Sequence, residues 1–172
     1  FGGGNEGYNI RVKEICQQAK DLNIFDEIIS YTEQDLMQDI EFWNCHKEFI
    51  THPNCIRGYG FMLWKPYIIM KTMEKMEMDD ILIYVDCGCV INPQGIERLY
   101  EYIDMVKNNN FGLLAFQLDD ACKEIYYTKR VLLEYLNVSN KYQITPQCIT
   151  GCIFIKKTIY SVFFIKTWYQ IA

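Results

Sequence analysis

Ile81-Leu82-Ile83-Tyr84-Val85 is an unbroken apolar run that leads directly into Asp86-Cys87-Gly88-Cys89, so that residues 81–89 read ILIYVDCGC. An apolar run of this length, rich in β-branched and aromatic residues, predicts a strand that is buried on both faces. Such strands are typical of parallel sheets whose faces are covered by helices. A carboxylate directly after such a strand is expected at the sheet edge where α/β proteins bind their ligands.

Amphipathic and apolar segments alternate on both sides of this strand. Apolar residues at helical spacing predict helices, and further apolar runs predict strands. The expected helices are 9–22, 34–39, the helix that Pro66 opens and Asp79-Asp80 ends, 93–107, 128–136 and 159–170, and the other expected strands are 25–31, 111–118 and 149–155. Outside helix 34–39, residues 32–63 are expected to be irregular. The alternation predicts an α/β fold, a three-layer α/β/α sandwich, in a single domain that spans residues 1–172.

The composition is that of one folded domain. Of the 172 residues, 50% are hydrophobic and 23% are charged, which excludes an intrinsically disordered chain. The net charge of -5 provides no positive field for a nucleic-acid partner. The apolar runs are shorter than the ~20 residues that cross a bilayer, so no transmembrane segment is expected. Because a glycine run commonly follows a strand, Gly2-Gly3-Gly4 predicts that this chain is a truncated domain that begins just inside its fold.

The eight cysteines are many for this length, but they follow no compact disulfide pattern. We therefore expect free thiols in a reducing compartment, and hence a cytoplasmic protein. Cys45, His46, His52 and Cys55 invite comparison with a zinc site. Their spacing, C-H-x5-H-x2-C, fits no common zinc module.

Polar residues near the predicted sheet edge are the candidates for a binding site. Asp86 is suited to a divalent cation or a ribose hydroxyl, and the alternative is an aspartate that caps the next turn. Lys65 stands at the start of the helix that Pro66 opens, where a bound anion would satisfy both the lysine and the helix amides. The alternative is a solvated lysine whose stem packs on Trp64. Arg57 is a second candidate for binding phosphate, or else a surface residue.

Several stretches together resemble the small GT-A-type glycosyltransferases of bacteria and large DNA viruses. They follow the family's order and span most of the chain, which makes the resemblance more specific than any single motif. The stretches are 57–67 (RGYGFMLWKPY), 81–92 (ILIYVDCGCVIN), 31–36 (YTEQDL), 127–130 (YTKR), and 146–147 (PQ) with Gly151.

This resemblance implies a GT-A fold and the transfer of a sugar from a UDP- or GDP-sugar to a hydroxyl of a glycan, lipid or protein acceptor. It also implies Mn²⁺ or Mg²⁺ on the donor diphosphate. Asp86 looks like the first acid of the family's DxD-type signature, which contacts ribose or metal, and Cys87 is the intervening residue. Gly88 stands in the place of the second acid, so the dependence on a metal stays open.

The N-terminal segment is expected to complete the donor site. Gly2-Gly3-Gly4-Asn5 looks like the loop after the first strand, where nucleotide-binding folds bring the backbone close to the donor. Tyr31 and Thr32 end the second predicted strand, where such folds meet the base or the ribose. The alternative for Tyr31 is a tyrosine of the core.

Carboxylates also follow the predicted strand 111–118. Transfer with inversion needs a general base near the acceptor hydroxyl, and Asp119-Asp120, with Glu124 shortly after, is the candidate. The alternative is a solvated acidic loop. By resemblance alone, Gln147, Thr150 and Gly151 border the acceptor.

Two other functions stay open at this point. The departure at Gly88 leaves room for a degenerate transferase that binds a nucleotide sugar or a glycan without catalysis. A nucleotidyltransferase shares the same kind of α/β nucleotide site, and it would release pyrophosphate.

Overall fold

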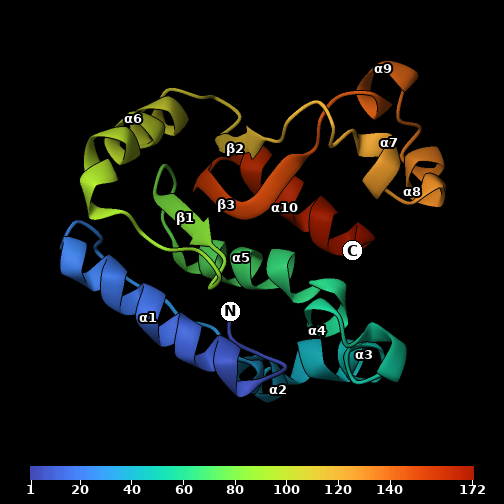
Figure 1. Ribbon diagram of the computed structural model, residues 1–172, viewed down its shortest axis with the longest axis horizontal. Coiled ribbons are helices and arrows are strands. Elements are labelled where there is room, and N and C mark those ends of the chain that lie inside the picture. Colours follow the sequence, from blue (N-terminus) through green and yellow to red (C-terminus); the bar gives the residue numbers. More distant parts are fainter.

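The computed structural model describes residues 1–172 and has a mixed α/β fold, in which ten helices surround a small sheet (Figure 1). The helices are α1 (Glu6–Leu22), α2 (Glu33–Gln38), α3 (Ile40–Ile50), α4 (Gly58–Phe61), α5 (Trp64–Lys75), α6 (Ile96–Lys107), α7 (Glu124–Tyr127), α8 (Arg130–Tyr135), α9 (Asn140–Gln143) and α10 (Ile159–Ile171). The strands are β1 (Ile81–Val85), β2 (Leu113–Gln117) and β3 (Cys148–Lys156), and two short 3-10 turns lie at Pro53–Cys55 and Pro93–Gly95.

The sheet has the order β1-β3-β2, and β3 is antiparallel to both of its neighbours. Val85 pairs with Cys152, and Gln117 pairs with Cys148. The prediction of a parallel sheet was therefore wrong for the strands that pair directly. The physical reason is that an apolar run indicates burial, whereas the direction of the neighbouring strand depends on the chain connections.

β1 and β2 nevertheless run in the same direction, because each is antiparallel to β3. Helix α6 makes the connection between them. The carboxyl ends of β1 and β2 therefore lie at one edge of the sheet, together with the amino end of β3. Asp86, Leu118 and Cys148 all stand at this edge, which we call the ligand edge.

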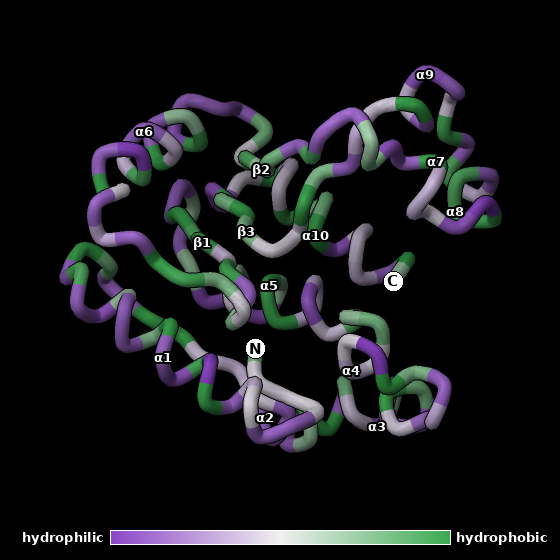
Figure 2. Tube along the Cα trace, in the orientation of Figure 1, coloured by the Kyte–Doolittle hydropathy of each residue, from purple (hydrophilic) through white to green (hydrophobic).

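Helices cover both faces of the sheet. On one face, the Tyr102 ring of α6 lies 5.6 Å from the ring of Phe154, and Val106 is fully buried. Figure 2 shows the mixture of hydrophilic and hydrophobic residues that makes α6 amphipathic. On the other face, Ile155 of β3 joins the core with Ile69 of α5 and Ile165 of α10. Alternate side chains along β3 thus pack against two separate helix layers.

Two sequence-based predictions in the N-terminal part were wrong. Residues 25–31 form no strand, because Asp26 and Glu27 interrupt the apolar residues and no neighbouring strand pairs with them; Thr32 alone makes a bridge, to Gly2. Residues 40–50, expected to be irregular, form α3 instead. The Asp39 side chain caps this helix by accepting from the Phe42 N–H at 3.1 Å.

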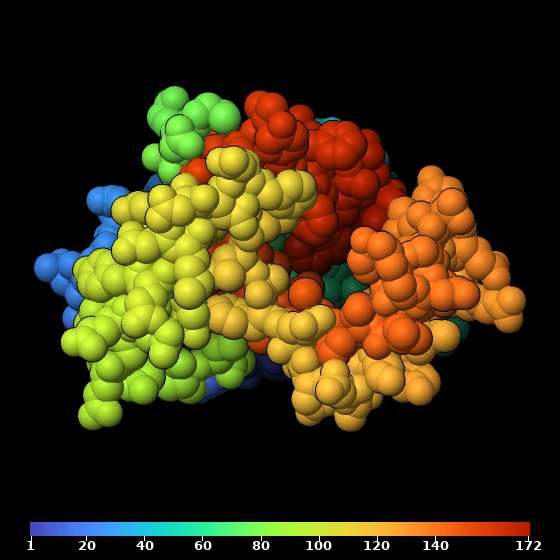
Figure 3. All heavy atoms as spheres, turned by 90° about the horizontal axis from the view of Figure 1, so that it is seen from above, coloured from blue at the N-terminus to red at the C-terminus, as the bar shows by residue number.

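The segment with α7, α8 and α9 stands apart from the sheet. An isolated antiparallel bridge between Lys123 and Pro146 closes its base. Figure 3 shows this segment in orange, separated by a hollow from α6 and β2 on the other side. Its tyrosines are largely exposed, with Tyr126 at 71% and Tyr135 at 77%. This segment forms one wall beside the ligand edge.

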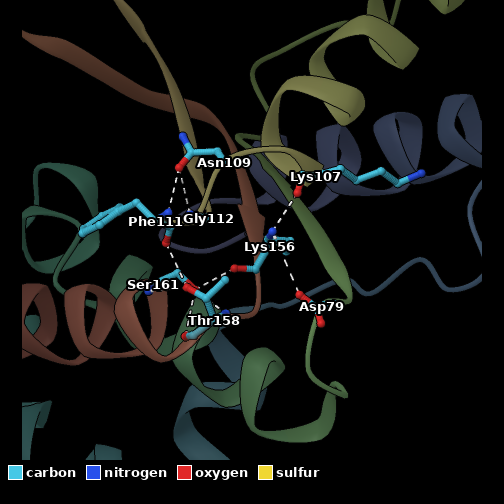
Figure 4. Close-up of polar contacts among 8 residues, drawn as sticks. All are labelled: Asp79, Lys107, Asn109, Phe111, Gly112, Lys156, Thr158 and Ser161. Carbon is cyan, nitrogen blue, oxygen red and sulfur yellow. Dashed lines mark hydrogen bonds and ion pairs between the residues drawn. The ribbon is translucent and has the colours of Figure 1, made fainter.

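A polar cluster holds the start of α10 against the loop before β2 (Figure 4). The Thr158 hydroxyl donates to the carbonyl of Phe111 at 2.9 Å, and the Ser161 hydroxyl donates to the carbonyl of Lys156 at 2.6 Å. Between them lies Gly112, whose φ of 83° is in the left-handed region. A Cβ on Gly112 would lie 2.6 Å from the carbonyl oxygen of Lys156. Only glycine fits this position without moving backbone.

We expect Gly112→Ala to lower the free energy of unfolding by about 2–4 kcal/mol, because it combines a strained φ with a backbone clash. The measurement is urea denaturation, read as a lower midpoint at an unchanged slope. Gly95→Ala is the matched control, since a Cβ there meets nothing within 4 Å. Equal stability of the two variants would contradict the expectation.

Candidate functional site

An ion pair between the buried Lys65 and the partly exposed Asp86 lies at the ligand edge. Lys65 is the second residue of α5 and is only 1% exposed. Its Nζ lies 3.0 Å from Asp86 Oδ1 and 3.2 Å from Oδ2, and it also donates to the carbonyl and the hydroxyl of Thr150, at 3.1 and 3.3 Å. The solvated lysine considered above is therefore wrong. The anion beside the positive end of α5 is the protein's own carboxylate.

Asp86 is held in place from several sides. The Tyr84 hydroxyl donates to Asp86 Oδ1 at 2.5 Å, and the Asp86 N–H donates to the carbonyl of Gly151 at 2.8 Å. Burial, followed by the charge of Asp86, raises the pKa of Tyr84 well above its ordinary value, so that this hydroxyl stays a donor. The Asp86 side chain remains 37% exposed. The carboxylate is thus fixed in orientation and still accessible from solvent.

The turn after Asp86 is tight, and one side of it is open. The Cys89 N–H donates to the carbonyl of Asp86 at 3.0 Å, which closes the turn. Cys87 is buried, and a Cβ on the exposed Gly88 would meet nothing within 4 Å. Burial raises the pKa of the Cys89 thiol and raises that of Cys152 to about 11. Near neutral pH these thiols are protonated and are poor metal ligands.

The residues at this edge do not fit the divalent cation that the resemblance implies. No group of three His, Cys, Asp or Glu side chains in the chain is arranged to hold a metal ion. The oxygens of Asp86 already accept from Lys65 and Tyr84, and a cation bound there would lie beside the Lys65 ammonium. Gly88 offers no side-chain oxygen where the second acid would stand.

The glycine segment and the predicted second strand end come together, as expected of one site. Gly2 donates from its N–H to the carbonyl of Tyr31 at 2.9 Å and accepts from the N–H of Glu33 at 2.9 Å. The Phe1 ring stacks on Trp64, with 3.9 Å between ring centroids. Phe1, directly before the glycines, therefore lies beside the start of α5.

Two of the polar residues in this segment serve local structure. Asn5 caps α1 by accepting from the Tyr8 N–H at 3.1 Å, and the Thr32 hydroxyl donates to Asp35 at 2.7 Å at the start of α2. Tyr31 packs against the core, and its hydroxyl lies 3.2 Å from that of Thr72. Tyr31 is therefore a tyrosine packed against the core, which was the alternative considered from the sequence.

The predicted catalytic and acceptor residues divide into two groups. Asp119 and Asp120 are exposed after β2, and Asp119 accepts from the N–H of Ala121 within its own turn. Glu124 is half-buried and accepts from the side-chain amide of Gln147 at 3.3 Å. Gln147 thus lies beside Glu124, one of the carboxylates that follow β2.

Thr150 and Gly151, predicted to border the acceptor, lie instead at the Lys65–Asp86 pair. Since residues along a strand advance by about 3.3 Å each, Gln147 and Thr150 are about 10 Å apart. The two groups are therefore near neighbours along one strand. A ligand of nucleotide-sugar size would reach from one to the other.

Arg57 is exposed and makes no side-chain hydrogen bond or ion pair, and no contact joins it to Asp86.

Cys45 and His46 also do not form a zinc centre with the other thiols, because His46 Nε2 lies 2.8 Å from the Tyr169 hydroxyl. All eight cysteines are free thiols in the structure, and of these Cys55 and Cys87 are buried.

Two residues at the ligand edge were not predicted as site residues from the sequence. Tyr84 was assigned only to the buried strand, although its spacing of two from Asp86 places both side chains on one face. Arg11 of α1 reaches the turn, with Nη2 3.5 Å from the carbonyl oxygen of Cys89. No sequence signal marks this second contact, because 78 residues separate the partners.

Two cavities lie elsewhere. One, of about 260 Å³, is lined by residues of α5 and α10, and the other, of about 210 Å³, lies between α2 and α5. Neither is lined by Lys65 or Asp86.

Comparison with known proteins identifies no relative. No protein-family model matches the chain, and neither a curated protein nor a solved structure is significantly similar to it. None of its helices combines the length and the apolar character needed to cross a membrane. The function proposed below therefore rests on the residues and geometry of this chain.

Proposed function

We propose that this chain is a glycosyltransferase of the GT-A type that binds a nucleotide sugar at the ligand edge. The observation that carries the proposal is the Asp86 carboxylate, which is oriented by Lys65 and Tyr84 and is still 37% exposed directly after β1. Carboxyl ends of strands are where open α/β sheets bind ligands. Two of the stretches that resemble the transferase family, residues 57–67 and 81–92, meet at this edge through Lys65 and Asp86.

In this proposal the ribose of the donor binds to Asp86. A fixed carboxylate with one open side accepts hydrogen bonds from a pair of adjacent ribose hydroxyls. Gly88 has no side chain and lets the donor approach the turn. The helix layers on both faces of the sheet support a three-layer arrangement.

The acceptor binds on the side of β2, α7 and β3. Asp119 and Asp120 remain the proposed general-base positions, with Glu124 and Gln147 beside them. In a transfer with inversion, the base removes the proton of the acceptor hydroxyl while the oxygen of that hydroxyl forms a bond to the anomeric carbon of the sugar. The bond from that carbon to the diphosphate breaks, and nucleoside diphosphate leaves with the electron pair. A hydroxyl of a glycan, a lipid or a protein is the acceptor class.

A donor screen tests this function. The purified chain is titrated calorimetrically with UDP, GDP and their sugars, and release of nucleoside diphosphate is then measured with each sugar donor. We expect micromolar binding of one nucleotide series and slow release of that diphosphate. Absence of binding to every nucleotide overturns the proposal. A nucleotidyltransferase would instead be identified with a nucleoside triphosphate and a sugar 1-phosphate as substrates, from which it releases pyrophosphate. Nucleotide binding without turnover of either substrate set would identify a binding module.

A further inference from the structure

The charge of the donor diphosphate needs a cationic partner, and the usual divalent cation has no prepared site here. Asp86 is already neutralised by Lys65 at 3.0 Å, and the position of the second acid is Gly88. Lys65 itself is unsuited to a phosphate, because it is 1% exposed and its donors are directed to Asp86 and Thr150. Another cation must therefore face the phosphates.

Arg11 is the cation that contacts the turn from outside. Its guanidinium Nη2 lies 3.5 Å from the carbonyl oxygen of Cys89, while Nη1 pairs with Glu14 at 2.7 Å. A second contact holds helix α1 against residues 89–91, since Gln18 Oε1 accepts from the Ile91 N–H at 2.9 Å. The Arg11 side chain is 40% exposed. It thus has free donors at the mouth of the turn.

We propose that Arg11 neutralises the donor diphosphate and that this site binds nucleoside diphosphates without a divalent cation. This inference rests on the proposed function. A guanidinium carries five N–H donors in a fork that matches two phosphate oxygens. With one donor on Glu14 and one on Cys89, three remain for the phosphates. As the leaving diphosphate gains charge, a preoriented guanidinium stabilises it as a metal ion would.

Binding of UDP and GDP, measured by calorimetry in EDTA and again with Mn²⁺, tests this inference. We expect dissociation constants within threefold of each other in the two conditions, and at least tenfold weaker binding by Arg11→Gln. Arg98→Gln is the matched control, because Arg98 makes the same i,i+3 pair with Glu101 on α6. The uncharged nucleosides uridine and guanosine should bind both variants equally, since they have no phosphate for Arg11.

The outcomes separate the two proposals. Binding that appears only with Mn²⁺, or an Arg11→Gln variant that binds like the unmodified chain, overturns this inference and leaves the proposed function standing. No binding in any condition overturns the proposed function itself. Thermal unfolding of both arginine variants verifies that each is folded.

Gly88→Asp gives an independent test by supplying the missing carboxylate. A side chain at this exposed position meets nothing within 4 Å, so the variant is expected to fold normally. Titration with Mn²⁺ alone, followed by electron paramagnetic resonance, should show a bound ion in Gly88→Asp and none in the unmodified chain. Tight Mn²⁺ binding by the unmodified chain at this edge would contradict the inference.

Discussion

Asp86→Asn is expected to weaken the binding of the preferred nucleotide by about 100-fold while the chain stays folded. Oδ1 already accepts from Lys65 and Tyr84, so the open side that faces the ribose hydroxyls is at Oδ2, and an amide whose oxygen keeps the first two contacts presents a donor there instead. Each hydrogen bond to a charged group contributes about 1.5–3 kcal/mol, and a loss near 3 kcal/mol corresponds to about 100-fold in affinity. The amide still gives Lys65 an oxygen acceptor, which limits the effect on folding.

Calorimetry with the nucleotide and with its free nucleoside measures this effect. Both ligands should lose affinity in Asp86→Asn, because both carry the ribose. Asp79→Asn is the matched control, since Asp79 precedes β1 at its opposite end and its side chain is 81% exposed. Wild-type affinity in Asp86→Asn would remove Asp86 from the binding site, and with it the observation on which the proposed function rests.

Much of the fold could be predicted from local patterns, because each pattern reflects burial of one segment. The amphipathic spacing of residues 93–107 predicted α6, and the apolar runs predicted all three strands of the sheet. The direction of β3 was not predictable in this way, because pairing depends on residues far apart in the chain. Residues 25–31 show the opposite error, since an apolar segment without a pairing neighbour forms no strand.

The candidate site was predictable only as far as its position after a strand. Asp86 stands where the sequence places it, at the end of β1. The burial of Lys65 was not predictable, because its acceptors are Asp86, directly after β1, and Thr150 of β3, which are 21 and 85 residues away. The contact of Arg11 with the turn depends in the same way on how α1 packs. Long-range packing, rather than local sequence preference, assembles this site.

Lys65→Met is expected to have the second large effect on nucleotide binding, and it tests whether Lys65 positions Asp86. Without the ammonium, Asp86 keeps only the Tyr84 hydroxyl as a side-chain donor and is free to turn toward water. We expect about tenfold weaker binding of the nucleotide and of the free nucleoside. The free energy of unfolding should change by only about 1 kcal/mol, because methionine fills a similar volume and the remaining carboxylate is partly hydrated.

Asp86→Ala should behave differently, because it leaves the ammonium of Lys65 behind. Lys65 is 1% exposed, so water cannot replace the lost carboxylate, and only Thr150 remains as an acceptor. Removing one partner of a buried pair costs about 3–5 kcal/mol. The double variant Lys65→Met/Asp86→Ala should recover most of that stability, which urea denaturation measures as a coupling between the two sites. If Lys65→Met binds the nucleotide and the nucleoside as tightly as the unmodified chain, the positioning role assigned to Lys65 is wrong.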